Sequence, residues 1–124
     1  MKLRMQGQSL RLRLRPAEVE ALAERGRVDE RIVFGPEPNE ALTYALEVDE
    51  AAASLTLRHA PGSLTVLVPL EQAAVWASSD QVGFEGEVDV GDEEPLRLLV
   101  EKDWQCLEPR PGEDESDLYP HPNA

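Results

Sequence analysis

The sequence predicts an α+β domain built from two similar halves, each with the order strand, strand, helix, strand, strand. Three observations support this fold class. The chain of 124 residues has the length of one domain. Two stretches about 54 residues apart share one pattern, and each contains a short helical segment. Because the connections are short, most neighbouring strands are expected to pair antiparallel.

The first half opens with two apolar-rich runs on either side of a turn at Gly7. Residues 10–14 alternate leucine with arginine, which is typical of a strand with one buried face. A helix is expected to begin at Pro16, because proline suits the first helical position, and to end at Gly26. The remaining strands of this half are expected at residues 28–34 and 42–49.

The second half repeats this pattern from residue 55 onward. Ser63 corresponds to Ser9, and Pro69 corresponds to Pro16, so the second helix is expected to begin at Pro69. Further strands are expected at residues 81–87 and 96–103. We therefore predict one domain over residues 1–107, with halves at about 1–51 and 54–103, followed by an acidic, proline-rich tail at 108–124.

Eight strands and two helices suggest an antiparallel sheet that closes, or nearly closes, into a barrel covered by the helices. Two stacked sheets are the alternative. The tail is expected to pack along the domain through apolar anchors at Trp104, Leu107, Leu118 and Tyr119. The predicted core contains Leu12, Leu14, Val19, Leu22, Val66, Val68, Leu98 and Val100.

The formal net charge of −13 argues against nucleic acids and membranes as partners, because an anionic surface repels phosphate backbones and acidic headgroups. Residues 1–31 nevertheless carry eight cations against five anions. No secretory signal or membrane-spanning stretch is visible, and the single cysteine excludes an intrachain disulfide framework. The chain is therefore expected in the cytoplasm.

The amino-terminal strands carry the first candidate site, a cationic face that binds an anion. Five cations fall on one side if these strands pair across the Gly7 turn, and like charges opposed across strands are destabilising. Arginine geometry suits phosphate and carboxylate groups. The alternative is that the protein's own carboxylates cover these side chains. The candidates are Lys2, Arg4, Arg11, Arg13 and Arg15.

Paired acids at the ends of equivalent strands form the second candidate site. Glu47 with Asp49, and Glu101 with Asp103, share a face within each strand, and four acids meeting on a twofold axis would suit Mg²⁺ or Ca²⁺. Ordinary solvent-exposed acids are the alternative. The set Cys106, His59 and His121 lacks the spacings of a zinc site or a nucleophilic pair, so no cofactor is predicted.

The opening residues 1–13, the segment 42–46 and the ending 100–107 with its acidic run at 113–117 resemble a family of small uncharacterised bacterial proteins. The resemblance covers nearly the whole chain and implies a compact bacterial protein without implying an activity. We therefore expect a small binding or interaction module, whose partner is a small anionic ligand or a protein. The alternative is an enzyme acting on an anionic, phosphorylated substrate, with or without a divalent metal.

Overall fold

The computed structural model describes residues 1–103 and Tyr119, and it has the predicted α+β composition of eight strands and two helices. The first half of the chain contains β1 (Lys2–Gln6), β2 (Ser9–Leu14), α1 (Pro16–Arg25), β3 (Arg27–Val33) and β4 (Ala41–Asp49). The second half contains β5 (Thr56–Ala60), β6 (Ser63–Pro69), α2 (Leu70–Ser78), β7 (Gly83–Val88) and β8 (Leu96–Lys102).

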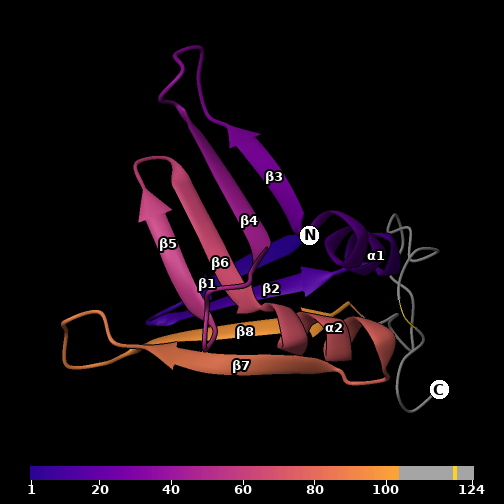
Figure 1. Cartoon of the computed structure of the whole chain (residues 1–124). Helices are drawn as coiled ribbons and strands as arrows, with labels where there is room; N and C mark the ends of the chain where they lie inside the picture. Colours follow the sequence, from indigo (N-terminus) through magenta and orange to yellow (C-terminus); the bar gives the residue numbers. More distant parts are fainter. Residues whose placement is uncertain (104–118, 120–124) are drawn as a thin grey trace, which may run out of the picture.

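The strands form two separate four-stranded sheets, so the predicted barrel is wrong, and the alternative of two stacked sheets is correct only in the number of sheets. Sheet A has the order β1-β2-β8-β7 and sheet B has the order β3-β4-β6-β5. The sheets meet at an angle, and both helices lie at the same end of the molecule (Figure 1). Each half thus contributes one hairpin to each sheet.

The two central strands of each sheet run parallel, which corrects the prediction of a purely antiparallel sheet. The hairpins β1–β2, β3–β4, β5–β6 and β7–β8 are antiparallel as expected. Each central pair joins strands from different halves, β2 with β8 and β4 with β6. A helical crossover or a long connection separates such strands, and that length permits parallel pairing.

The register of the two sheets repeats at a constant offset of 54 residues. Ser9 pairs with Arg97 in sheet A, and Ser63 pairs with Thr43 in sheet B. The hairpin partners Lys2 and Arg13 correspond in the same way to Thr56 and Leu67. Only β7 departs from this spacing, because it begins at Gly83, two residues later than the expected strand.

The predicted start of the second helix is wrong by one residue. Pro69 is the last residue of β6 and the N-cap of α2, which begins at Leu70. Pro16, in contrast, is the first residue of α1, where its missing N–H leaves no hydrogen bond unmade. Both helices carry a glutamate in the first turn, Glu18 and Glu71, which complements the helix dipole.

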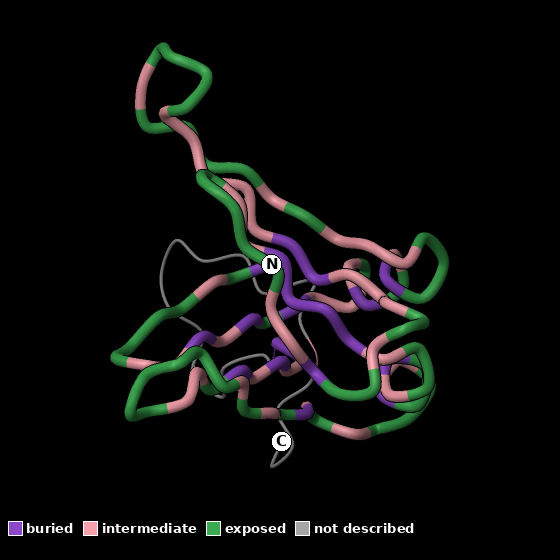
Figure 2. The backbone as a smooth tube through the Cα atoms, turned by 60° about the vertical axis from the view of Figure 1, so that its left-hand side comes forward, coloured by how far each residue is buried: buried purple, intermediate pink, exposed green. Residues whose placement is uncertain are grey.

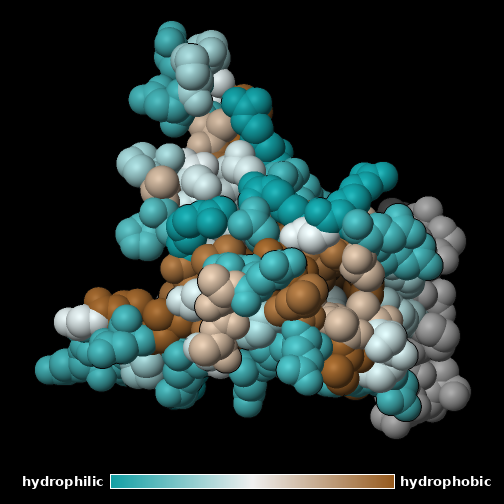
Figure 3. Space-filling model, in the orientation of Figure 1, coloured by the Kyte–Doolittle hydropathy of each residue, from teal (hydrophilic) through white to brown (hydrophobic). Residues whose placement is uncertain are grey.

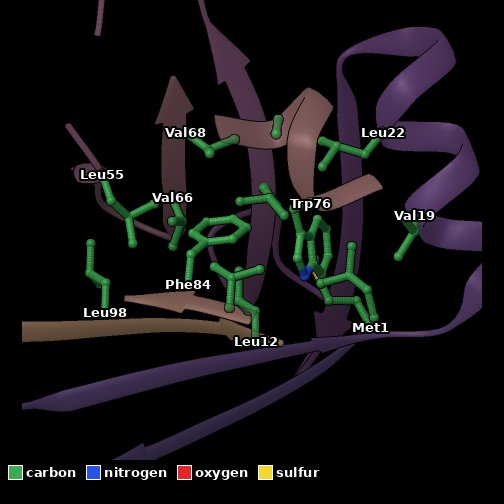
Figure 4. Close-up of a cluster of buried hydrophobic side chains, with 14 of the residues drawn as sticks. Met1, Leu12, Val19, Leu22, Leu55, Val66, Val68, Trp76, Phe84 and Leu98 are labelled. Atoms are coloured by element: carbon green, nitrogen blue, oxygen red, sulfur yellow. The ribbon is translucent and has the colours of Figure 1, made fainter. Parts of the chain in front are cut away.

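A single apolar core fills the angle between the sheets and the helices. All eight predicted core residues are buried in it. Trp76 on α2 lies at its centre, with its ring packed edge-on against Phe84 at a centroid distance of 5.2 Å (Figure 4). Burial is concentrated near the helices, and the far ends of the hairpins are exposed (Figure 2). The outer face of sheet A is partly exposed to solvent, whereas Thr65 and Leu67 on the outer face of sheet B are buried.

Candidate functional site

The cationic candidates gather on the outer face of sheet A. Arg4 lies directly opposite Arg11, and Lys2 lies directly opposite Arg13 across the β1–β2 hairpin. Leu10, which alternates with these arginines along β2, points into the core. Strand periodicity thus separates a buried leucine row from an exposed row of cations. We call Lys2, Arg4, Arg11 and Arg13 the arginine face.

A hollow of about 370 Å³ lies over the arginine face, lined by its four cations and Leu3. The side chains of Lys2 and Arg13 are 62% and 44% exposed, so the hollow opens to solvent. Arg15, the fifth candidate, does not line it. It sits at the N-cap of α1, where its main-chain N–H donates to the Glu18 carboxylate at 2.9 Å. Four of the five candidate cations therefore lie together around one hollow.

Carboxylates from β8 and its end neutralise part of this charge. Glu101 Oε1 lies 3.0 Å from Arg13 Nε and 3.4 Å from Arg11 Nε. Lys2 Nζ lies 3.1 Å from Oδ2 of Asp103, which is buried. Among the described residues, Arg4 has no ion pair. The protein's own carboxylates thus reach Lys2, Arg11 and Arg13, but the face keeps an excess of cations.

The four acids predicted to hold a metal are not brought together. Glu47 and Asp49 belong to β4 in sheet B, and Glu101 and Asp103 lie in or after β8 in sheet A. Glu47 binds arginines of its own sheet, at 2.8 Å from Arg27 and 3.2 Å from Arg58. Within residues 1–103 and Tyr119, no three His, Cys, Asp or Glu side chains group in a way that suits a metal.

A second hollow, of about 580 Å³, adjoins the first over β2, β8 and β7. Arg11 lines both hollows. The second one is mixed in charge, because Glu85 and Glu87 face Arg97 there, with Arg97 Nε 4.0 Å from Glu87 Oε1. The outer face of sheet A therefore changes from cationic at β1 to acidic at β7, and the excess of cations is confined to the β1–β2 end.

Two polar clusters inside the fold were not predicted from the sequence. The Met1 ammonium group binds Glu18 and Glu30, and Tyr44 Oη donates to Glu30 at 2.8 Å. Burial opposes ionisation of Glu30, but the hydrogen bonds from the Met1 amine and Tyr44 outweigh it and lower the pKa of Glu30. Burial and the bond to Glu30 raise the pKa of Tyr44 to about 12. The spacing of these residues along the chain gave no signal.

The second cluster is centred on Lys102, a lysine almost fully buried at the end of β8. Its Nζ donates to Ser79 O at 2.7 Å and lies 5.9 Å from the Trp76 ring centroid and 5.4 Å from that of Tyr119. Burial lowers the pKa of Lys102, and Asp80 opposes that change. Period-2 alternation along β8 places Lys102 on the inner face, so the sequence pattern alone predicts its burial. A charged residue is rarely expected in a core, which is why it was missed.

The remaining candidates are placed as follows. His59 is exposed on β5, opposite Leu64. Cys106 and His121 lie outside the described residues, as do the anchors Trp104, Leu107 and Leu118. Tyr119 is described, and it packs against the core while its main-chain N–H donates to Asp103 O at 2.9 Å. One predicted anchor of the tail is therefore placed against the domain.

Comparisons with known proteins assign a family without a function. In the part of the chain that the structure describes, no helix is both long enough and apolar enough to cross a membrane. Neither the curated proteins nor the solved structures contain a match to this chain. A family model matches residues 1–123, in agreement with the resemblance noted in the sequence. The chain belongs to this family, the family of unknown function DUF7009.

Proposed function

We propose that this protein is a binding module that holds a small anionic ligand on the arginine face. The observation that carries the proposal is the solvent-open hollow that four cations line, with no carboxylate among the described residues of its lining. Like charges directly opposed across two strands cost free energy, roughly 0.2 to 1 kcal/mol per pair, and a bound anion removes that cost. Phosphate and carboxylate groups suit the site, because guanidinium groups bind them through paired hydrogen bonds.

The charge of the whole chain supports a small ligand over a long polyanion. The net charge is −13, and acids occupy the β7 side of the same face. A nucleic acid or membrane would have to approach these acids as well as the arginine face, and their repulsion would oppose it. The described lining of the hollow consists of four cations and Leu3, a set that suits holding an anion, so we favour binding over the alternative of an enzyme acting on a phosphorylated substrate.

The repeat in register supports the further proposal that the halves arose by internal duplication. The exchange of the two halves converts the strand order of sheet A into that of sheet B. The hairpin β1–β2 and the central parallel pair of sheet A then map onto their counterparts at the same offset. Arg58 is thus the counterpart of Arg4, and it provides a matched control that lies outside the arginine face.

Thermal unfolding in phosphate, sulfate and chloride at equal ionic strength tests the binding proposal. A ligand that binds only the folded state at 100 times its dissociation constant adds about 2.7 kcal/mol of stability. We expect phosphate or sulfate to raise the Tm of the wild-type protein and of Arg58→Ser, but to raise that of Arg4→Ser much less. An equal response in all three proteins, or no response, would contradict the proposal.

A further inference from the structure

The exposed edge of sheet B carries an arrangement that the anion site does not use. β3 is an edge strand, and its hairpin with β4 projects away from the body of the molecule (Figure 1). Ile32, Val33 and Phe34, at the free end of β3, are consecutive and all exposed. An exposed edge strand is a template for pairing with another chain, and this one ends in exposed apolar residues.

The main chain of β3 is available for pairing along this edge. Phe34 N donates to Glu40 O across the β3–β4 hairpin. Hydrogen-bonding direction alternates along an antiparallel strand, so every second residue before Phe34 also points its N–H and C=O toward β4. The intervening residues, among them Asp29 and Arg31, direct these groups outward. Among the described residues, no other main-chain group bonds to them.

The charges on β3 are complementary to a second copy of the same strand. In an antiparallel pair centred on Glu30, Asp29 of each copy lies opposite Arg31 of the other, and both residues direct their main-chain groups outward. On the inner side, Val28 lies opposite Ile32. The shift of the pairing by one rung in either direction places Arg31 opposite Arg31 or Asp29 opposite Asp29. Like charges then meet, so only the first register is favoured.

Glu30 lies opposite Glu30 of the other copy at the centre of this pair, where two negative charges meet. The Met1 ammonium group offsets part of the negative charge on each Glu30. Its carboxylate already binds the Met1 amine at 2.5 Å and Tyr44 Oη at 2.8 Å within the same chain. It also points to the inner side of sheet B, opposite Tyr44 in the hairpin register. The Met1 ammonium group, which also binds Glu18, offsets part of the charge of each Glu30 carboxylate and reduces the repulsion between the two copies.

We propose that two copies of this chain associate through β3, and that this antiparallel contact joins their sheets B into one mixed sheet of eight strands. The interface is isologous, because a twofold axis perpendicular to the sheet relates the two copies. Asp29 of each copy then lies opposite Arg31 of the other. It leaves the arginine faces free, because these lie on the outer faces of sheets A. The contact is small for a stable complex, so the dimer is expected to be weak and dependent on concentration.

Sedimentation velocity over a range of concentrations tests the dimer, combined with a charge exchange. Asp29→Arg and Arg31→Asp each place like charges opposite one another twice, so each should weaken association at least tenfold. The double variant restores opposite charges and should dimerise like the wild type. Glu20→Arg, an exposed charge change on α1, should have no effect, and circular dichroism should confirm that every variant folds.

Hydrogen exchange provides a second measurement. Protection of the Asp29 and Arg31 amides should rise with protein concentration, because these N–H groups bond only across the proposed interface. A wild-type chain that stays monomeric at millimolar concentration overturns the proposal. Dimerisation of both single variants at wild-type strength also overturns it, because the interface then lies elsewhere.

Discussion

Sheets A and B share strand pattern and register, but their outer faces differ in charge. Arg11 and Arg13 of sheet A correspond to Thr65 and Leu67 of sheet B, which are only 2% and 8% exposed. Sheet B therefore builds the same central pairing without a cationic cluster. The fold does not require the arginines of sheet A, and the cost of their mutual repulsion is specific to that sheet. This difference is the main reason to assign them a binding role.

Neutralisation also differs between the two outer faces. In sheet B, Glu47 binds Arg27 and Arg58, and the first of these also binds Asp29 at 2.9 Å. These two cations and two acids are therefore paired with one another. In sheet A, Glu101 is shared by two arginines, and Arg4 has no ion pair among the described residues. Sheet B thus resembles an ordinary charged surface, whereas the cations of sheet A are only partly paired with acids among the described residues.

The largest expected effect compares the two inner faces. Leu12→Ala should lower the free energy of unfolding by about 2–5 kcal/mol, because it leaves a cavity in the core. Val66→Ala, at the corresponding position of sheet B, should cost about 1.5–3 kcal/mol. Met5→Ala at the exposed end of β1 should cost less than about 0.5 kcal/mol. Urea unfolding measures all three.

Leu98→Ala should behave like Leu12→Ala, with a cost of about 2–5 kcal/mol. If Leu12→Ala and Leu98→Ala both cost less than about 1 kcal/mol, sheet A does not share the main core. The common inner surface on which the comparison of the two sheets rests would then be lost.

The second prediction gives sheet A the residues of sheet B. The double variant Arg11→Thr/Arg13→Leu should lose the Tm response to phosphate or sulfate. Its stability in chloride should change by less than about 1 kcal/mol, because the loss of two opposed like-charge pairs offsets the lost contacts with Glu101. Thermal unfolding of the variant measures both quantities. A variant that keeps the anion response would show that the arginine face is not the site.

The third prediction concerns Tyr44, whose counterpart in sheet A is the buried Leu98. Burial and the hydrogen bond to Glu30 raise the pKa of Tyr44 to about 12. The neutral Tyr44 side chain therefore stabilises the fold fully below pH 10, and this stabilisation is lost as the pH rises toward 12. Absorbance titration of tyrosinate should show one tyrosine ionising near pH 12. Tyr44→Phe should remove that step, and a wild-type titration in which Tyr44 ionises near 10 would contradict the proposed bond to Glu30.

The smallest effect is expected at Glu47. Hydrogen bonds from Arg27, and less strongly from Arg58, lower its pKa against the opposing effect of burial. The stabilisation is therefore fully present above the unfolded pKa of about 4.5 and is lost as the pH falls through the lower folded value. Glu47→Gln should reduce the loss of stability below pH 4.5, by less than about 1 kcal/mol. Urea unfolding at pH 3 to 7 measures the difference, and an unchanged pH profile would contradict it.

Local patterns predicted the elements, and non-local pairing escaped them. Alternation over residues 10–14 placed β2 and its buried face correctly, because side-chain direction depends only on period. The parallel contact between Ser9 and Arg97 depends on which distant strand arrives, and nothing in either strand encodes that choice. Barrel closure failed for the same reason. Lys102 was missed because a lysine is rarely expected in a core, although period-2 alternation places it on the inner face of β8.

The structure brings four of the five candidate cations together, and it places the two pairs of candidate acids in different sheets. The hairpin alone determines that Lys2 and Arg13 face each other, so a local pattern was sufficient. Glu101 and Asp103 were assigned to a metal, but the parallel pairing of β8 with β2 brings them to the arginine face instead. Apolar surface gathers in the angle between the sheets, and polar residues dominate the projecting hairpins (Figure 3).

Each half of the chain contributes one hairpin to each sheet, and this arrangement affects the order in which the sheets fold. In sheet B the central strands pair Thr43 with Ser63, only 20 residues apart, whereas in sheet A Ser9 must find Arg97, 88 residues away. The entropy of closing a loop grows with its length, and contacts between distant residues form slowly. Sheet B is therefore expected to form first. The arginine face receives its partners on β8 only when the last long loop closes, so a nascent or truncated chain lacks the completed face.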